Sequence, residues 1–240
     1  MRAAIVHYWL LNLRGGEKVV EALCRLLPDA DIFTLFYDPE KVSPVIRSRR
    51  VQASFLQPLR KHYRSILPLM PLALESFDLR GYDLVVSSES GPAKGVILPS
   101  TTRHVCYCHT PMRYLWDLYP AYRNDWTRSR WKRALMTPFA NYLRLWDYAS
   151  AARVDDFVAN SENVRRRIWK TYRRESQVMA PSRTVQDSGL SLAFHPVRVL
   201  PSNMLIQPSL SSAAMAHEAM SAAAIKPSES VFIVCSSLDV

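Results

Sequence analysis

Residues 3–27 read AAIVHYWLLNLRGGEKVVEALCRLL, and this stretch decides the fold. Residues 3–8 form a short apolar run that predicts a buried strand. Residues 17–27 place their apolar side chains at helical spacing, and two glycines between the strand and the helix allow a tight turn. A strand, a glycine turn and a helix in this order predict the first unit of a parallel sheet covered by helices.

The same alternation continues along the chain. Further strands are expected at residues 31–36, 51–55, 84–87, 104–107 and 157–159, and their nearly continuous hydrophobicity fits strands that are buried on both faces. Pro68 and Pro71 divide residues 61–79 into two short helical pieces, and residues 127–151 predict a long helix that Pro138 can break. The expected class is therefore α/β.

The character of the sequence changes after residue 176. Residues 180–224 contain serine and alanine runs, scattered prolines and few aromatic residues. Because such a composition offers little apolar area to offset the entropy of ordering, we expect a poorly ordered tail. Residues 230–237 predict one isolated strand. We therefore divide the chain into a domain at residues 1–178 and an irregular tail at residues 179–240.

The excess of positive over negative charge lies entirely in the first part of the chain. Residues 1–176 hold 28 lysines and arginines against 17 acidic residues, whereas residues 177–240 hold 3 against 4. A basic surface of this kind favours phosphate-bearing partners such as a nucleotide, an anionic membrane or nucleic acid, and a merely solvated basic surface is the plain alternative. No recognisable nucleic-acid module accompanies the charge, so we expect no specific nucleic-acid partner.

Targeting signals and cysteines point to the cytoplasm. The sequence shows neither a run of about 18 apolar residues for a transmembrane helix nor a signal peptide at its start. The four cysteines of a chain of this size do not make a disulfide framework. We expect a cytoplasmic protein that can contact the inner face of the membrane peripherally.

Two loops that follow predicted strands carry candidate binding residues. Arg14, Gly15 and Gly16 lie between a strand and a helix, where backbone N–H groups can hold an anion, although a tight turn without a ligand explains the glycines nearly as well. His109 directly follows another strand, at the end where open α/β sheets bind ligands, and its imidazole can hydrogen-bond a hydroxyl or a phosphate.

Lys94 and a basic helix are further candidates for contact with phosphate. Lys94 lies in the loop of residues 87–95, where it can meet a lipid diphosphate as a point charge or belong to an ordinary Gly-Pro turn. Residues 164–174 predict a helix with six cations and an apolar stripe of Val164, Ile168 and Tyr172. Such a helix can lie on an anionic membrane, or it can pack against the core and expose its basic face to solvent.

We expect no metal site. Cys106 and Cys108 lie on one face of a strand beside His109, but no second ligand pair follows at zinc-site spacing. Asp29 and Asp31 form the D-x-D pattern of a divalent-cation site, yet their place at the entry to a strand is typical of a solvated turn.

Residues 106–117 read CYCHTPMRYLWD and residues 156–161 read DFVANS. Together with the glycine loop, these motifs resemble the N-terminal, Rossmann-like domain of a family 4 glycosyltransferase of the GT-B fold, close to bacterial mannosyltransferases of surface polysaccharide and lipopolysaccharide synthesis. The resemblance covers residues 1–178. It implies a metal-independent, retaining transfer of a sugar from a nucleotide sugar, often GDP-mannose, to a lipid-linked or glycan acceptor, without a further cofactor.

The resemblance also assigns roles to individual residues. It places the loop of Arg14, Gly15 and Gly16 against the donor phosphates and the acceptor. It makes His109 the catalytic candidate in the cleft, and Arg113 a contact to phosphate or acceptor through its planar guanidinium fork. The loop that carries Lys94 faces the acceptor side in the relatives.

The departure from the family pattern begins near Met179. The donor-binding groups of the family lie in a second domain, and none of them can be placed on this sequence. A frameshift, a truncated gene or a fragment would each produce this pattern, and half a cleft cannot surround the departing diphosphate with positive groups. We therefore expect little or no transferase activity from this chain alone. The alternative is a non-catalytic domain that binds a partner enzyme or an anionic membrane.

Overall fold

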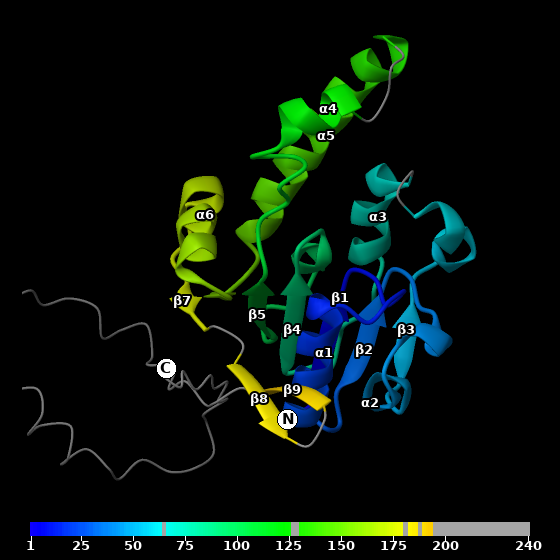
Figure 1. Ribbon diagram of the computed structural model, residues 1–240, viewed down its shortest axis with the longest axis vertical. Coiled ribbons are helices and arrows are strands. Elements are labelled where there is room, and N and C mark those ends of the chain that lie inside the picture. Colours follow the sequence, from blue (N-terminus) through cyan, green and yellow to red (C-terminus); the bar gives the residue numbers. More distant parts are fainter. Residues whose placement is uncertain (64–65, 126–129, 180–181, 187–188, 194–240) are drawn as a thin grey trace, which may run out of the picture.

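The computed structural model describes residues 1–63, 66–125, 130–179, 182–186 and 189–193. Seven parallel strands form the central sheet in the order β3-β2-β1-β4-β5-β6-β7 (Figure 1). The strands are β1 (Ala3–His7), β2 (Asp31–Thr34), β3 (Val51–Ala53), β4 (Leu84–Glu89), β5 (Arg103–Cys108), β6 (Asp156–Ala159) and β7 (Gln177–Val178). The α/β class and all six strands expected from apolar runs are thereby confirmed, and β7 is an addition.

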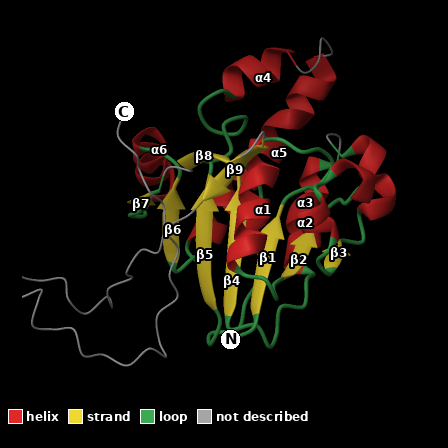
Figure 2. Ribbon diagram, turned by 60° about the horizontal axis from the view of Figure 1, so that its bottom comes forward, coloured by secondary structure: helices red, strands yellow, loops and turns green. Residues whose placement is uncertain are grey.

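Helices cover both faces of this sheet (Figure 2). The longer ones are α1 (Gly15–Leu26), α3 (Met70–Glu75), α4 (Tyr119–Asp125), α5 (Arg130–Ala151) and α6 (Glu162–Tyr172), and α2 (Pro44–Arg47) is a single turn. Four short 3₁₀ segments complete the described helices: η1 (Pro39–Lys41), η2 (Gln57–His62), η3 (Leu67–Leu69) and η4 (Ala93–Gly95). Rossmann-like architecture follows from this layering.

Alternate residues of the strands feed two separate cores. Ile5 of β1 packs with Val20 and Leu23 of α1 on one face, and Val6 packs with Leu74 of α3 on the other. Successive side chains of a strand point to opposite faces, so the uninterrupted apolar runs of the sequence supply both layers at once. On the second face, Val164, Ile168 and Tyr172 of α6 are buried against β5 and β6, which confirms the apolar stripe of that helix.

The prolines act differently in the two helical regions. Pro68 and Pro71 stand in the first turns of η3 and α3, where a missing N–H costs nothing, so the predicted short pieces are confirmed. Pro138 lies inside α5, which continues through it from Arg130 to Ala151. Helix α4 and the first part of α5 project beyond the carboxyl ends of the strands (Figure 1).

A short hairpin follows β7 in the described part of the segment for which we expect an irregular tail. Strands β8 (Ser182–Gln186) and β9 (Gly189–Ala193) pair in antiparallel fashion as a separate two-stranded sheet. Thr184 pairs with Ser191 and Val185 with Leu190 in this hairpin. The strand predicted at residues 230–237 and the rest of the tail lie outside the described residues.

Candidate functional site

The strand order reverses beside β1, and this reversal creates the crevice where a ligand binds in open α/β sheets. From β1 the chain first builds outward through β2 and β3, and then returns to place β4 on the other side of β1. His7 ends β1 in register with Ser88 of β4. The carboxyl ends of β1, β4 and β5 and the start of α1 therefore converge on one edge, which we call the switch-point edge.

Arg14, Gly15 and Gly16 form the start of α1 at this edge. Arg14 is the N-cap residue, and its backbone N–H donates to the Glu17 carboxylate over 3.0 Å. Glu17 is buried, and burial raises the pKa of its carboxyl. A Cβ atom added at Gly15 would meet nothing within 4 Å. Gly15 is exposed, whereas a Cβ atom at Gly16 would stand 3.4 Å from the His7 ring, so the helix start is open at its first residue and packed against β1 at the second.

His109 is half-buried and held by its Nε2 atom. This atom lies 3.0 Å from Oγ of Ser88, and the imidazole packs edge-on against Tyr107 with ring centroids 5.3 Å apart. Burial lowers the pKa of His109 to about 4. At neutral pH its ring is uncharged, and it can offer or accept a hydrogen bond without bringing a positive charge to the cleft.

His7 is a site residue that the sequence analysis did not single out. Its side chain is 0% exposed, and its Nδ1 atom lies 3.0 Å from the backbone oxygen of Ser88. Burial, together with the neighbouring His109, lowers the pKa of His7 to about 3. A polar residue at the end of an otherwise apolar first strand is the signal that points to it.

Arg113 lies exposed on the loop that follows β5. Its Nε atom stands 4.0 Å from Oδ2 of Asp117, and the same oxygen lies 3.4 Å from Nε of Arg167 in α6. Arg167 also donates to Oγ1 of Thr110 over 3.3 Å. The loop of residues 109–118, which we call the His-Arg loop, is therefore tied to α6, while Arg113 keeps its guanidinium at the surface.

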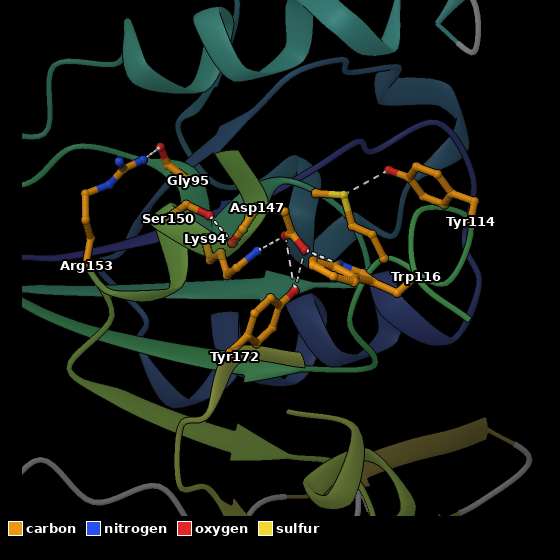
Figure 3. Close-up of polar contacts among 9 residues, drawn as sticks. Lys94, Gly95, Tyr114, Trp116, Asp147, Ser150, Arg153 and Tyr172 are labelled. Atoms are coloured by element: carbon orange, nitrogen blue, oxygen red, sulfur yellow. Dashed lines mark hydrogen bonds and ion pairs between the residues drawn. The ribbon is translucent and has the colours of Figure 1, made fainter. Parts of the chain in front are cut away.

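Lys94 occupies a different place from the one predicted. Its side chain is 0% exposed, and its ammonium forms an ion pair with the equally buried Asp147 of α5 (Figure 3). The same carboxylate accepts hydrogen bonds from Trp116 Nε1 at 2.7 Å and from the Tyr172 hydroxyl at 2.9 Å. Lys94 is thus a core residue in this structure, because desolvating an ammonium requires a partner that the protein itself supplies.

The cysteines and aspartates that are candidate metal ligands have other surroundings in the structure. Cys106 and Cys108 are buried thiols that form no disulfide, and Asp31 accepts hydrogen bonds from Arg2 and Tyr82. In the part of the chain that the structure describes, no three His, Cys, Asp or Glu side chains gather as metal ligands.

An apolar cavity of about 300 Å³ lies directly behind the His-Arg loop. It is lined by residues of that loop, of η3, of α4 and of α5, namely Leu67, Pro68, Tyr114, Leu115, Tyr119, Tyr122, Met136, Phe139, Ala140 and Leu143. Arg144 of α5 fixes the loop beside it by donating to the Leu115 carbonyl over 2.7 Å.

No helix among the described residues is both long and apolar enough to cross a membrane.

Comparison with known proteins identifies the family. No curated protein matches the chain. Residues 13–181 match the model of Glycosyltransferase Family 4, and this region includes the start of α1, the His-Arg loop and all strands from β2 to β7. The sheet order and the switch-point edge agree with this match, and the chain belongs to glycosyltransferase family 4.

Proposed function

We propose that this chain supplies the acceptor side of a glycosyltransferase, with sugar transfer at the switch-point edge. One observation carries this proposal: the His-Arg loop follows β5 with His109 and an exposed Arg113, and it lines an apolar cavity with Tyr114 and Leu115. Polar groups for a sugar or a phosphate and an apolar space for a lipid thus lie on one short loop. A ligand with a charged head and an aliphatic tail fits both.

The donor is a nucleotide sugar in this proposal. The start of α1 at Gly15 and Gly16 suits a phosphate oxygen as a helix N-terminus, and the exposed guanidinium of Arg113 can bind a second one in a fork. The resemblance noted above makes GDP-mannose the donor that we propose, with retention at the transferred sugar. His109, neutral at physiological pH, is the proposed catalytic residue and hydrogen-bonds the reacting sugar or phosphate.

The acceptor is lipid-linked rather than a free glycan in this proposal. The lining of the cavity is aliphatic and aromatic, so it gains from burying hydrocarbon and offers little to a sugar chain. A lipid diphosphate would place its tail among Leu115, Ala140 and Leu143 and its phosphates near Arg113. Cell-envelope polysaccharide synthesis on the inner face of the cytoplasmic membrane uses acceptors of this chemistry.

A titration with two probes tests the acceptor. Farnesyl diphosphate is a soluble lipid diphosphate, and inorganic pyrophosphate is its headgroup alone. We expect the 240-residue chain to bind farnesyl diphosphate at least tenfold more tightly than pyrophosphate in isothermal titration calorimetry. Ala140→Phe fills the cavity, because Ala140 lines it and is almost fully buried, and this variant should lose the tenfold gain.

Leu145→Phe is the matched control. Leu145 lies on the same helix, is 64% exposed and does not line the cavity, so this variant should bind farnesyl diphosphate as the native chain does. Equal affinity of the native chain for both probes would refute the lipid-linked acceptor and favour a glycan. Tight binding that survives Ala140→Phe would place the lipid elsewhere.

A non-catalytic role is the second candidate, and α6 supports it. The outer side of this helix exposes Arg166, Trp169 and Lys170, a combination of cations and an aromatic ring that suits an anionic membrane. The same helix gives a glycosyltransferase peripheral membrane contact. Absence of binding to both GDP-mannose and farnesyl diphosphate, with retained binding to vesicles of phosphatidylglycerol, would favour the non-catalytic domain.

A further inference from the structure

At the switch-point edge, Ser88 links His7 and His109 through two separate hydrogen bonds, one to its backbone oxygen and one to its hydroxyl. His7 reaches the backbone oxygen of Ser88, and the hydroxyl of Ser88 reaches Nε2 of His109, each over 3.0 Å. His7 and Ser88 are both 0% exposed. Water therefore does not reach either residue in this arrangement, and the hydrogen in each of the two hydrogen bonds has to be placed by the protein itself.

The first proton is fixed by a carbonyl. A backbone oxygen only accepts hydrogen bonds, so Nδ1 of His7 carries the hydrogen that lies between it and Ser88. In the neutral imidazole Nε2 is then bare, and this atom is buried without a partner in the described part of the chain. His7 consequently anchors the end of β4 as a donor and does not act as a cation.

The second proton belongs to the serine hydroxyl. Within the described residues, the hydrogen-bond partner of Ser88 Oγ is Nε2 of His109. If Nε2 of His109 carried a hydrogen, the hydroxyl hydrogen of Ser88 would be left buried without an acceptor, which folded proteins avoid. The satisfied arrangement has the hydroxyl donating to a bare Nε2, and the hydrogen of the neutral His109 ring then resides on Nδ1.

We propose that His7 and Ser88 are positioning residues that hold His109 in its Nδ1–H tautomer, so that His109 meets the substrate as a hydrogen-bond donor. Its Nδ1 atom has no partner among the described residues and is the nitrogen left for a ligand. The group that it fits is an oxygen with a lone pair, such as a phosphate oxygen or a sugar hydroxyl. The role of His109 toward substrate rests on the proposed function, whereas its tautomer does not.

Nuclear magnetic resonance measures the tautomer directly. In long-range ¹H–¹⁵N spectra of the chain labelled with ¹⁵N-histidine at pH 7, we expect a protonated Nδ1 and a bare Nε2 at both His7 and His109. Ser88→Ala removes the donor to Nε2, so the Nε2–H form of His109 should become populated. A native His109 that carries its hydrogen on Nε2 would overturn the proposal without any variant.

The neighbouring residue supplies a matched control. Ser87 is also 0% exposed, and its hydroxyl lies 2.9 Å from Nε2 of His104. Ser87→Ala should therefore change the His104 signals and leave His109 as it is. If Ser88→Ala left the His109 nitrogens unchanged, or if Ser87→Ala altered them to the same extent, the serine would not set the tautomer.

Two variants of His7 test its role in positioning His109. His7→Asn retains an N–H donor for the Ser88 carbonyl, whereas His7→Leu removes it. We expect the Nδ1–H tautomer of His109 to persist in the first variant and to become mixed in the second. Identical His109 signals in the two variants would exclude His7 as a positioning residue. If the leucine variant fails to fold, the spectra of the native chain and of Ser88→Ala still test the role of Ser88.

Ligand titration separates this inference from the proposed function. Farnesyl diphosphate or GDP-mannose, added to the labelled chain, should shift the Nδ1 signal of His109 more than its Nε2 signal. Binding without any change at His109 would overturn the donor role even if the tautomer is as proposed. If neither ligand binds, the proposed function fails. The tautomer of His109 is still tested, because its spectra and those of the serine variants are measured without ligand.

Discussion

Gly95 lies where the indole of Trp146 crosses the η4 turn. A Cβ atom added at Gly95 would stand 2.1 Å from two atoms of that ring, a separation that real carbon atoms do not reach. Nε1 of Trp146 donates to Glu75 over 2.8 Å, and Arg153 binds both Glu75 and the Gly95 carbonyl. The ring therefore cannot turn aside without breaking the contacts that join α5 to α3.

Gly95→Ala is accordingly expected to lower the free energy of unfolding by about 1–3 kcal/mol, the usual cost of overpacking. Gly15→Ala is the comparison, since open space surrounds Gly15 and alanine reduces the entropy of the unfolded chain. That variant should be neutral or more stable by about 0.4–1 kcal/mol. Urea denaturation measures the free energy of unfolding of both variants. Equal effects at the two glycines would show that the Trp146 ring moves aside at no cost.

At the scale of elements, Asp147 attaches α5 to its neighbours. This carboxylate gathers an ammonium from η4, an indole from the His-Arg loop and a phenol from α6. Three elements therefore meet on one buried side chain (Figure 3). Because an uncompensated charge in the core is far more costly than a lost neutral hydrogen bond, the members of this cluster are not equivalent.

Lys94→Met leaves Asp147 buried without its counter-ion and should lower the free energy of unfolding by about 3–5 kcal/mol. Tyr172→Phe removes one hydroxyl and should cost about 0.5–1.5 kcal/mol. Arg80→Ala breaks the exposed pair with Asp78 and should have no measurable effect. Thermal and urea unfolding rank the three variants, and a Lys94 variant as stable as the Arg80 variant would contradict a structural role.

The elements also show what the sequence can and cannot predict. Buried parallel strands were predictable because both of their faces are apolar, and α6 was predictable from its stripe. Lys94 was misplaced because its partner Asp147 lies 53 residues away, and a lysine after a strand looks the same whether its ammonium meets a ligand or a carboxylate. His7 required the strand order, which places it beside Ser88 and which no local pattern contains.

At the scale of the whole molecule, buried neutral histidines make stability depend on pH. Burial lowers the pKa of His7 to about 3 and the pKa values of His104 and His109 to about 4. In the unfolded chain each takes up a proton near pH 6.5, the ordinary pKa of a histidine. Between these limits the unfolded state binds more protons, so acid favours unfolding.

We therefore expect full stability above about pH 6.5 and a progressive loss as the pH falls toward about 4. Each buried histidine contributes at most about 1.4 kcal/mol per pH unit within this window. Urea unfolding at pH 7, 6 and 5 measures the slope, and His104→Gln should make it shallower by removing one of the three groups. A free energy of unfolding that does not change between pH 7 and 5 would contradict neutral burial of these rings.

The order of the strands has one more consequence, which concerns association between copies of the chain. An unpaired strand at the margin of a sheet is a template for another chain, and long flat margins promote aggregation. The outermost strands here are β3 with three residues and β7 with two, and the longest strands, β4 and β5, are enclosed between neighbours. The edge strands of the central sheet therefore offer a second chain only a few unpaired backbone groups. The same strand order that places β1 beside β4, and so His7 beside Ser88, thus disfavours edge-to-edge polymerisation.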